Sequence, residues 1–190
     1  MQTRFISQVA ALLLIAFSHF AIADEYADTR KVFQNAGESS AFFQNSYAYA
    51  LFPSIGKGGI GIGGAYGDGK VFVGGNAVGE TSMTQLSIGL QLGGQVYSQV
   101  IFLEDKRAYD EFTSGNFEFS AQATAVAITA AAGAQSSTGG GSSAGASGGK
   151  KDASTVSAGY NKGMAVFTVA KGGLMYEAAI AGQKYSYKAN

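Results

Sequence analysis

A serine and a lysine stand three residues apart at Ser54 and Lys57, a spacing that can pair a serine nucleophile with a lysine base. The same spacing recurs at Ser147 and Lys150, inside a Gly/Ser-rich stretch. The chemistry requires a helix that begins at the serine and aims the lysine at it, and SIGKGG is a poor helix former. We therefore interpret both matches as chance.

Two pairs of carboxylates, Glu104–Asp105 and Asp110–Glu111, are the next candidates for chemistry. Adjacent residues of a helix do not share a face, so neither pair is expected to converge on a substrate. Lys106 and Arg107 lie between the pairs, as on a solvated helix surface. We expect no enzymatic activity, with an enzyme that uses lysine or carboxylates as the remaining alternative.

Glycine makes up half of residues 56–75, GKGGIGIGGAYGDGKVFVGG. Gly59, Gly61 and Gly64 form a G-x-G-x-x-G pattern, but a dinucleotide site needs a helix to open directly after it. Here a turn and a strand follow, and no Gly-Lys pair precedes Ser or Thr. The pattern instead predicts a strand with a glycine face, against which another backbone or a bulky aromatic side chain can pack.

The first 23 residues predict a secretory signal peptide. Arg4 precedes an apolar run over 9–17, and small residues lead to a cleavage site near Ala23. The apolar run is about half of the ~20 residues that a spanning helix needs. We therefore expect residues 1–23 to be removed and the mature protein to be periplasmic or secreted.

The mature chain would contain neither cysteine nor histidine, because the sequence has no Cys and its one His is His19. This composition excludes Ser-His-Asp and Cys-His catalysis, His-ligated metals, haem on a His or Cys ligand, and thiolate-bound iron–sulfur clusters. We expect no cofactor and no metal. Without Arg4, 12 of the 13 basic residues remain against 13 acidic ones, a balance that argues against a nucleic-acid partner.

Residues 24–190 are expected to form one domain. Helical spacing predicts a helix over 26–36, a second over 38–50 and a mid-chain helix over 104–115. Period-two alternation predicts strands from Lys57 onward, with a turn at YGDGK, 66–70. Residues 136–152 are Gly/Ser-rich and predict a mobile loop, and beyond them MAVFTVA, GLMYEAAI and QKYSYK predict closing strands. The expected fold is α+β: a predominantly antiparallel curved β-sheet, as a small barrel or sandwich, with two N-terminal helices and one mid-chain helix.

Lysines flank several of the predicted strands. Lys57 and Lys70 flank the glycine-rich hairpin, and Lys171 follows the late strand MAVFTVA. They could gather at one end of the sheet beside backbone N–H groups that bind anions, or they could only protect turns and sheet edges.

The aromatic segment AFFQNSYAYALF, 41–52, contains Phe42, Phe43 and Tyr47. Phe and Tyr settle at lipid interfaces, but the segment lacks the basic face of an interfacial helix. Covering the core is therefore the alternative role.

Three blocks carry a resemblance to a known family: FPSIGKGGIGIGGAYGDGKV, then SIGLQLGGQVYSQVIF with the following AYDEF, and finally KGGLMYEAAIAGQKYSY. In this order, from Phe52 to Tyr187, the chain resembles the SYLF-domain family, which is known for lipid binding and, in fungal members, for actin binding. The resemblance implies one SYLF-like lipid-binding domain over 24–190, β-rich with packed helices, that binds phospholipids rather than catalysing a reaction.

Our hypothesis from the sequence is an exported lipid-binding protein. Lys57, Lys70 and Lys171 would contact anionic phospholipid headgroups, while Phe42, Phe43 and Tyr47 would touch acyl chains. The partner would be a phospholipid or membrane surface, with no nucleotide and no nucleic acid. The alternative is a small outer-membrane β-barrel, since the roughly 167 residues after the signal peptide suit eight strands of about ten residues.

Overall fold

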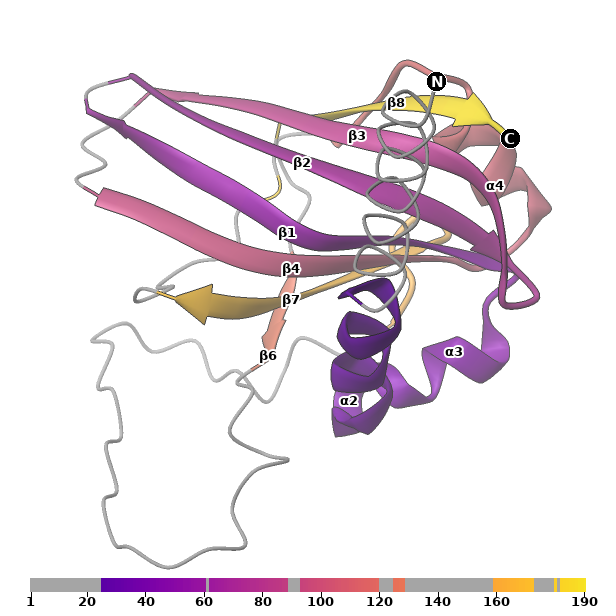
Figure 1. Ribbon diagram of the computed structural model, residues 1–190. Coiled ribbons are helices and arrows are strands. Elements are labelled where there is room, and N and C mark those ends of the chain that lie inside the picture. Colours follow the sequence, from indigo (N-terminus) through magenta and orange to yellow (C-terminus); the bar gives the residue numbers. More distant parts are fainter. Residues whose placement is uncertain are drawn as a thin grey trace, which may run out of the picture.

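The chain forms one curled β-sheet with helices on both of its faces (Figure 1). This computed structural model describes residues 25–60, 62–88, 93–119, 125–128, 159–172, 180 and 182–190. The sheet has eight strands in the order β5-β8-β3-β2-β1-β4-β7-β6, and every neighbouring pair is antiparallel except β6 and β7. The predicted α+β fold with a curved, mainly antiparallel sheet is confirmed.

The four longest strands follow one another in the chain and form the middle of the sheet. They are β1 (Ala48–Ile60), β2 (Ile62–Val73), β3 (Asn76–Ile88) and β4 (Gly93–Leu103). The flanking strands are β5 (Phe117–Glu118), β6 (Val126–Ile128), β7 (Met164–Gly172) and β8 (Gln183–Ala189). The strands predicted from MAVFTVA and QKYSYK are therefore confirmed as β7 and β8.

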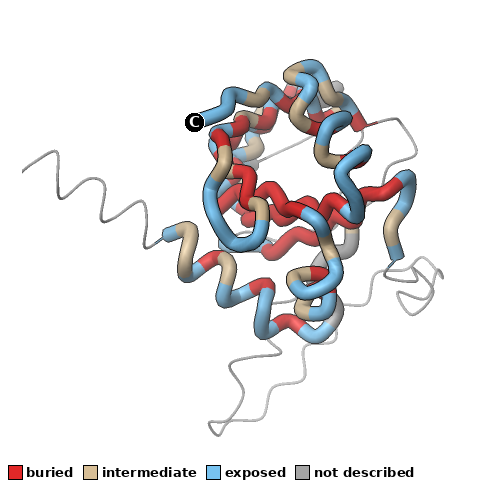
Figure 2. The backbone as a smooth tube through the Cα atoms, turned by 90° about the vertical axis from the view of Figure 1, so that its right-hand side faces the viewer, coloured by how far each residue is buried: buried red, intermediate tan, exposed pale blue. Residues whose placement is uncertain are grey.

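The N-terminal helices cover one side of the sheet, which we call the outer face. Residues 25–35 are helical, and two single turns follow, α2 (Gly37–Ser40) and α3 (Phe42–Asn45). Phe33 and Phe42 are buried against outer-face side chains such as Phe102. Figure 2 shows these helices outside the curl of the strands. The first predicted helix is confirmed, but the break lies at Ala36, one residue before the predicted position, and Gly37 begins α2.

The second predicted helix, 38–50, is wrong beyond Asn45. Strand β1 begins at Ala48, and Tyr49 and Leu51 pack on the outer face while Ala50 and Phe52 pack on the inner face. A strand that is buried on both faces lacks the alternation of polar and apolar residues, so the spacing of its aromatic residues resembled that of a helix.

The predicted turn at YGDGK is also wrong, because residues 66–70 lie inside β2. The turn between β2 and β3 is Gly74–Gly75, whose φ angles of 56° and 84° are left-handed and suit glycine in a two-residue hairpin. Pro53 lies where the register of β1 shifts against both neighbours, a bulge that tolerates a residue without an N–H.

The predicted mid-chain helix is confirmed as α4 (Lys106–Phe112), which is shorter than the predicted 104–115 and packs against the inner face of the sheet. Asp105 caps it by accepting a hydrogen bond of 2.8 Å from the Ala108 amide. Ala108 and Phe112 are fully buried, and the Phe112 ring lies 5.1 Å from that of Tyr185 on β8. The predicted signal peptide, 1–23, the predicted loop, 136–152, and most of the predicted strand GLMYEAAI lie outside the described residues.

The inner core contains a buried polar cluster of Gln99, Gln183, Tyr185 and Tyr97. The Gln99 amide donates to Gln183 Oε1 at 3.1 Å and to the Tyr185 hydroxyl at 2.8 Å. The Gln183 amide donates to the Tyr97 hydroxyl at 3.2 Å. These bonds join β4 to β8 across the curl and satisfy groups that would be costly to bury alone.

Two glycines of β2 allow large side chains of β1 to lie across the inner face. A Cβ at Gly69 would stand 2.6 Å from a ring carbon of Phe52, and one at Gly67 would stand 2.6 Å from Cγ1 of Ile55. An aromatic side chain therefore packs on glycine backbone at Gly69, a residue that the sequence assigned to a turn and not to the predicted glycine face around 59–64.

Replacement of Gly69 by Ala is expected to lower the free energy of unfolding by about 1–3 kcal/mol, because the new methyl group overlaps Phe52 and the Leu51 carbonyl. Gly58→Ala is the matched control, since an added Cβ there meets nothing within 4 Å. Urea unfolding measures both. Equal stability of the two variants would contradict a packing role for Gly69.

Stability is expected to fall above about pH 10, the ordinary pKa of tyrosine. Burial raises the pKa of Tyr97 and the pKa of Tyr185 well above this value, so the folded state keeps protons that the unfolded chain has lost. The stabilisation is therefore complete below pH 10 and lost as the pH rises further. Urea midpoints measured across this range should fall less steeply for Tyr97→Phe than for the unchanged protein. Identical slopes would count against this explanation.

Candidate functional site

Two of the three predicted lysines flank the start of the helical segment 25–35 on the outer face. Lys70 Nζ lies 5.1 Å from the centroid of the Tyr26 ring, and Lys171 Nζ forms an ion pair of 3.2 Å with Glu25 Oε1. Both ammonium groups therefore already have partners within the protein.

Lys57 lies on the other side of the sheet. It is two residues beyond Ile55, which is buried in the inner core, so Lys57 shares the inner face and is half-buried. Its cross-strand neighbours are Ala65 on β2 and Gln95 on β4. The structure therefore does not bring the three lysines together.

The serine and lysine of the S-x-x-K pattern also lie on opposite faces of the sheet. Ser54 is exposed on the outer face, whereas Lys57 belongs to the inner face of the same strand. The serine and lysine therefore do not face each other, which agrees with the interpretation of this spacing as chance.

The predicted aromatic residues hold α3 against the sheet. The Phe42 ring lies 5.4 Å from Phe102 and 5.1 Å from Phe167, and Phe42 is only 8% exposed. Phe43 packs against Tyr49 and Phe102 at 5.1 and 4.8 Å. Contact between Phe42 and an acyl chain would require α3 to leave the sheet.

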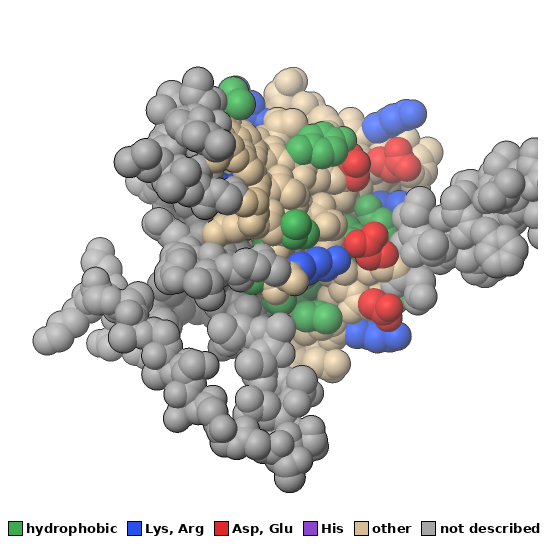
Figure 3. Space-filling view, turned by 60° about the vertical axis from the view of Figure 1, so that its left-hand side comes forward, with side chains coloured by type: hydrophobic (Ala, Val, Ile, Leu, Met, Phe, Trp, Pro, Cys, Tyr) green, Lys and Arg blue, Asp and Glu red, His purple; other side chains and the backbone are tan. Residues whose placement is uncertain are grey.

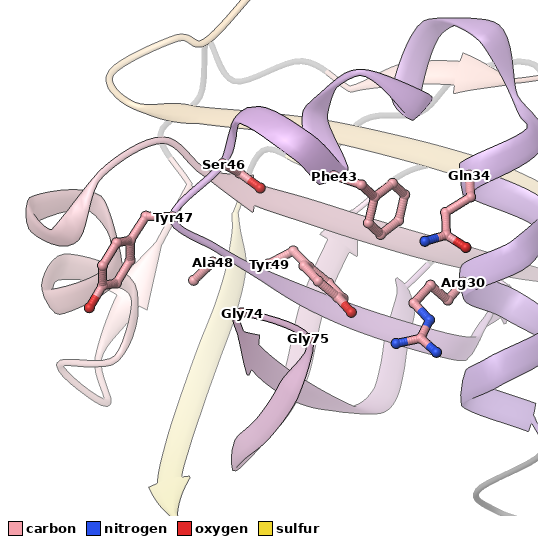
Figure 4. A pocket seen from close by; sticks show the side chains of 9 residues that line it. All are labelled: Arg30, Gln34, Phe43, Ser46, Tyr47, Ala48, Tyr49, Gly74 and Gly75. Atoms are coloured by element: carbon pink, nitrogen blue, oxygen red, sulfur yellow. The ribbon is translucent and has the colours of Figure 1, made fainter.

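Tyr47 lies between α3 and β1 and is 41% exposed, with its ring 5.7 Å from that of Tyr109. Phe43 and Tyr47 both line a pocket of about 290 Å³ that also contains Arg30 (Figure 4). The helical spacing of the sequence places Arg30 correctly on the first helix but gives no indication of this pocket.

An exposed apolar surface lies at the glycine-rich end of the sheet and was not predicted. Tyr66, Leu86 and Val96 are 54%, 85% and 40% exposed, and they are three of the five exposed large hydrophobic residues in the described part of the chain. They lie on the outer face of β2, β3 and β4, beyond the helices. We call these three side chains, with Gly56 and Gly58 between them, the tip surface.

Glycine explains why these side chains are exposed. Gly56 on β1 lies between Tyr66 and Val96, and Gly58 lies between Gly64 and Gly94. A Cβ at Gly56 or Gly58 would meet nothing within 4 Å, so the backbone there is bare. Figure 3 shows separate hydrophobic side chains on a broad area of backbone and uncharged side chains. The glycine alternation is the sequence signal for this surface, although by itself it predicts only packing.

Charged side chains of α4 pair with one another at the surface. Lys106 Nζ lies 2.6 Å from Asp110 Oδ2, and an Arg107 guanidinium nitrogen lies 3.3 Å from Glu111 Oε2. Within the described ranges, no group of three or more His, Cys, Asp or Glu side chains could hold a metal ion. No helix among the described residues is long and apolar enough to cross a membrane.

Comparisons with known proteins agree with the resemblance seen in the sequence. The family model described as "Ysc84: Las17-binding protein actin regulator" matches residues 84–188, from β3 to β8. The chain is also similar to Beta cell expansion factor A of Aeromonas veronii, with 29% identity over 163 residues. That alignment covers 84% of this chain and 53% of the relative, so the chain spans about half of the relative's length. The family match covers more than half of the sequence, and the chain therefore belongs to the Ysc84 family, whose domain is also called SYLF.

Proposed function

We propose that this chain is an exported lipid-binding protein that meets a phospholipid surface with the tip surface. Membership of a family associated with lipid and actin-regulating interactions supports lipid binding, and the signal-peptide pattern of residues 1–23 supports export. The observation that carries the proposal is the exposure of Tyr66, Leu86 and Val96 around bare glycine backbone.

The tip surface has the chemistry of a membrane interface. Strand β1 is paired on both sides at Gly56 and Gly58, so its peptide groups already have partners in the sheet. Such a surface can approach acyl chains without burying unsatisfied backbone groups. Leu86 and Val96 offer apolar area, and Tyr66 offers a ring that suits the headgroup boundary, with its hydroxyl bonded to Asp68.

Lys57 is the predicted lysine best placed to assist this contact. It lies at the same end of the sheet on the inner face, where its stem is half-buried and its ammonium group can extend toward phosphate. Lys70 and Lys171 would first have to leave Tyr26 and Glu25. The proposal therefore assigns headgroup contact mainly to Lys57.

The double substitution Tyr66→Ser with Leu86→Ser is expected to weaken vesicle binding at least tenfold, because each apolar side chain moved from water into lipid contributes about 1.5–3 kcal/mol. Sedimentation with phosphatidylcholine vesicles, with and without phosphatidylglycerol, measures the loss. Val32→Ser is the matched control, since Val32 is 43% exposed on the helical segment 25–35. Unchanged binding by the double variant would remove the tip surface from the proposal.

Lys57→Gln is expected to reduce the preference for anionic over neutral vesicles, and to do so more than Lys70→Gln does. The effect should shrink as salt is added, since exposed charges are screened. Lys106→Gln serves as the control because Lys106 is paired with Asp110 on α4. The preference for anionic vesicles could instead persist in Lys57→Gln and disappear in Lys70→Gln. That result would contradict the role of Lys57 and assign headgroup contact to the outer face, which the helices cover.

A further inference from the structure

The pocket that contains Arg30 is shown in Figure 4. It lies toward the opposite end of β1 from the tip surface, because Ala48 of its lining pairs with Val73 whereas Gly56 pairs with Tyr66. Arg30 and Gln34 come from the helical segment 25–35, one turn apart on the same face. Tyr49 comes from the start of β1, and Gly74–Gly75 is the turn between β2 and β3. The pocket thus forms where the N-terminal helix crosses the end of the sheet.

Arg30 is the one charged residue in the lining. No carboxylate whose side chain the structure describes lies within 4 Å of its guanidinium group. Its neighbour Lys31, by contrast, pairs with Asp28 at 3.3 Å. A guanidinium group in a recess, without an acidic partner in the described part, is set up to receive an anion.

The other polar groups of the lining can also donate hydrogen bonds to an anion. They include the Gln34 amide and the hydroxyls of Ser46 and Tyr49, and no hydrogen bond to a described residue uses these three groups. Figure 4 shows the hydroxyl end of Tyr49 directed toward the Arg30 guanidinium. Tyr49 itself is only 6% exposed, so packing holds its ring in place.

Aromatic rings and bare backbone make up the rest of the pocket. Phe43 and Tyr47 line it, and the Phe43 ring is held edge-on against Tyr49 at 5.1 Å. At Gly74 and Gly75 an added Cβ would meet nothing within 4 Å, so a ligand can approach this turn closely. The pocket volume of about 290 Å³ lies at the small end of the range for ligand sites.

We propose that this pocket binds a single oxyanion group, carboxylate or phosphate, attached to an apolar moiety. The Arg30 guanidinium holds the oxyanion with two parallel hydrogen bonds, Gln34 and Tyr49 complete its shell, and Phe43 and Tyr47 contact the apolar part. The ligand can be a soluble organic acid or the head of an anionic lipid, because the two share this chemistry. The site is separate from the tip surface and does not depend on it.

Titration of the isotope-labelled protein with benzoate, phenyl phosphate and inorganic phosphate tests the proposal by amide NMR. We expect benzoate and phenyl phosphate to shift the Gly74 and Gly75 amide signals, and inorganic phosphate to bind more weakly because it lacks an apolar part. Arg30→Gln should weaken binding by about 10- to 100-fold, the effect of losing hydrogen bonds to a charged group. Arg30→Lys should give an intermediate loss because an ammonium group cannot form the bidentate pair.

Lys31→Gln is the matched control, since it removes a neighbouring charge outside the pocket and should bind as the unchanged protein does. Equal binding by Arg30→Gln and the unchanged protein, or no shift at Gly74 and Gly75 with any soluble probe and with phosphatidic acid vesicles, would overturn the proposal. Shifts with phosphatidic acid vesicles alone, lost in Arg30→Gln, would support it and identify a lipid head as the source.

The double variant Tyr66→Ser with Leu86→Ser separates this site from the proposed function. It should keep the response to phenyl phosphate even if vesicle binding is lost. A result against lipid binding by the tip surface would therefore not contradict the pocket, and a result against anion binding by the pocket would not contradict the tip surface.

Discussion

The ring of Phe52 lies across the backbone of Gly69, and the inner core is built around this contact. Any side chain at position 69 would overlap the ring of Phe52, which packs 5.6 Å from the Tyr185 ring, and that ring in turn lies 5.1 Å from Phe112 on α4. Gly67 makes the same space for Ile55 one step further along β2. These two gaps let side chains of β1 lie directly against the backbone of β2 on the inner face of the curled sheet.

Glycine serves a different purpose at the end of the same strands. At Gly67 and Gly69 it makes room for a neighbour, whereas at Gly56 and Gly58 it leaves the outer face bare. On β1, Tyr49 of the Arg30 pocket and Gly56 of the tip surface are seven residues apart, so the two sites lie roughly 25 Å apart at about 3.3 Å per residue. The two ends also differ in chemistry: one presents isolated apolar side chains on paired backbone, and the other a guanidinium group among hydrogen-bond donors.

Local signals in the sequence were enough to predict α4 and the first helix. Asp105 caps α4, and the first helix ends next to Gly37, at Ala36. The local sequence was misleading where tertiary contacts decide the secondary structure. Residues 48–50 lie in a strand because both faces of β1 are covered, and the Asp68–Gly69 pair lies inside β2 because Phe52 needs the space.

The candidate sites were harder to predict for a related reason. The bulge at Pro53 shifts the alternation of inner-face and outer-face residues along β1 by one position. The faces on which Ser54 and Lys57 lie could therefore not be obtained by counting from Tyr49. The partners of Lys70 and Lys171 come from a helix distant in sequence. Arg30 meets Gly74–Gly75 only after the hairpin has folded under the helix.

The position of β8 has a consequence for how the chain folds. Its residues, 183–189, are nearly the last of the sequence, yet they pair with β3 beside the central strands. Tyr185 and Gln183 then supply the ring and the amide that fill the middle of the curl. Phe52 and Met83 therefore lack this cover until β8 has been synthesised and has paired with β3. The paired residues Ser82 and Ser186 are 104 positions apart, and such non-local pairing favours slow folding.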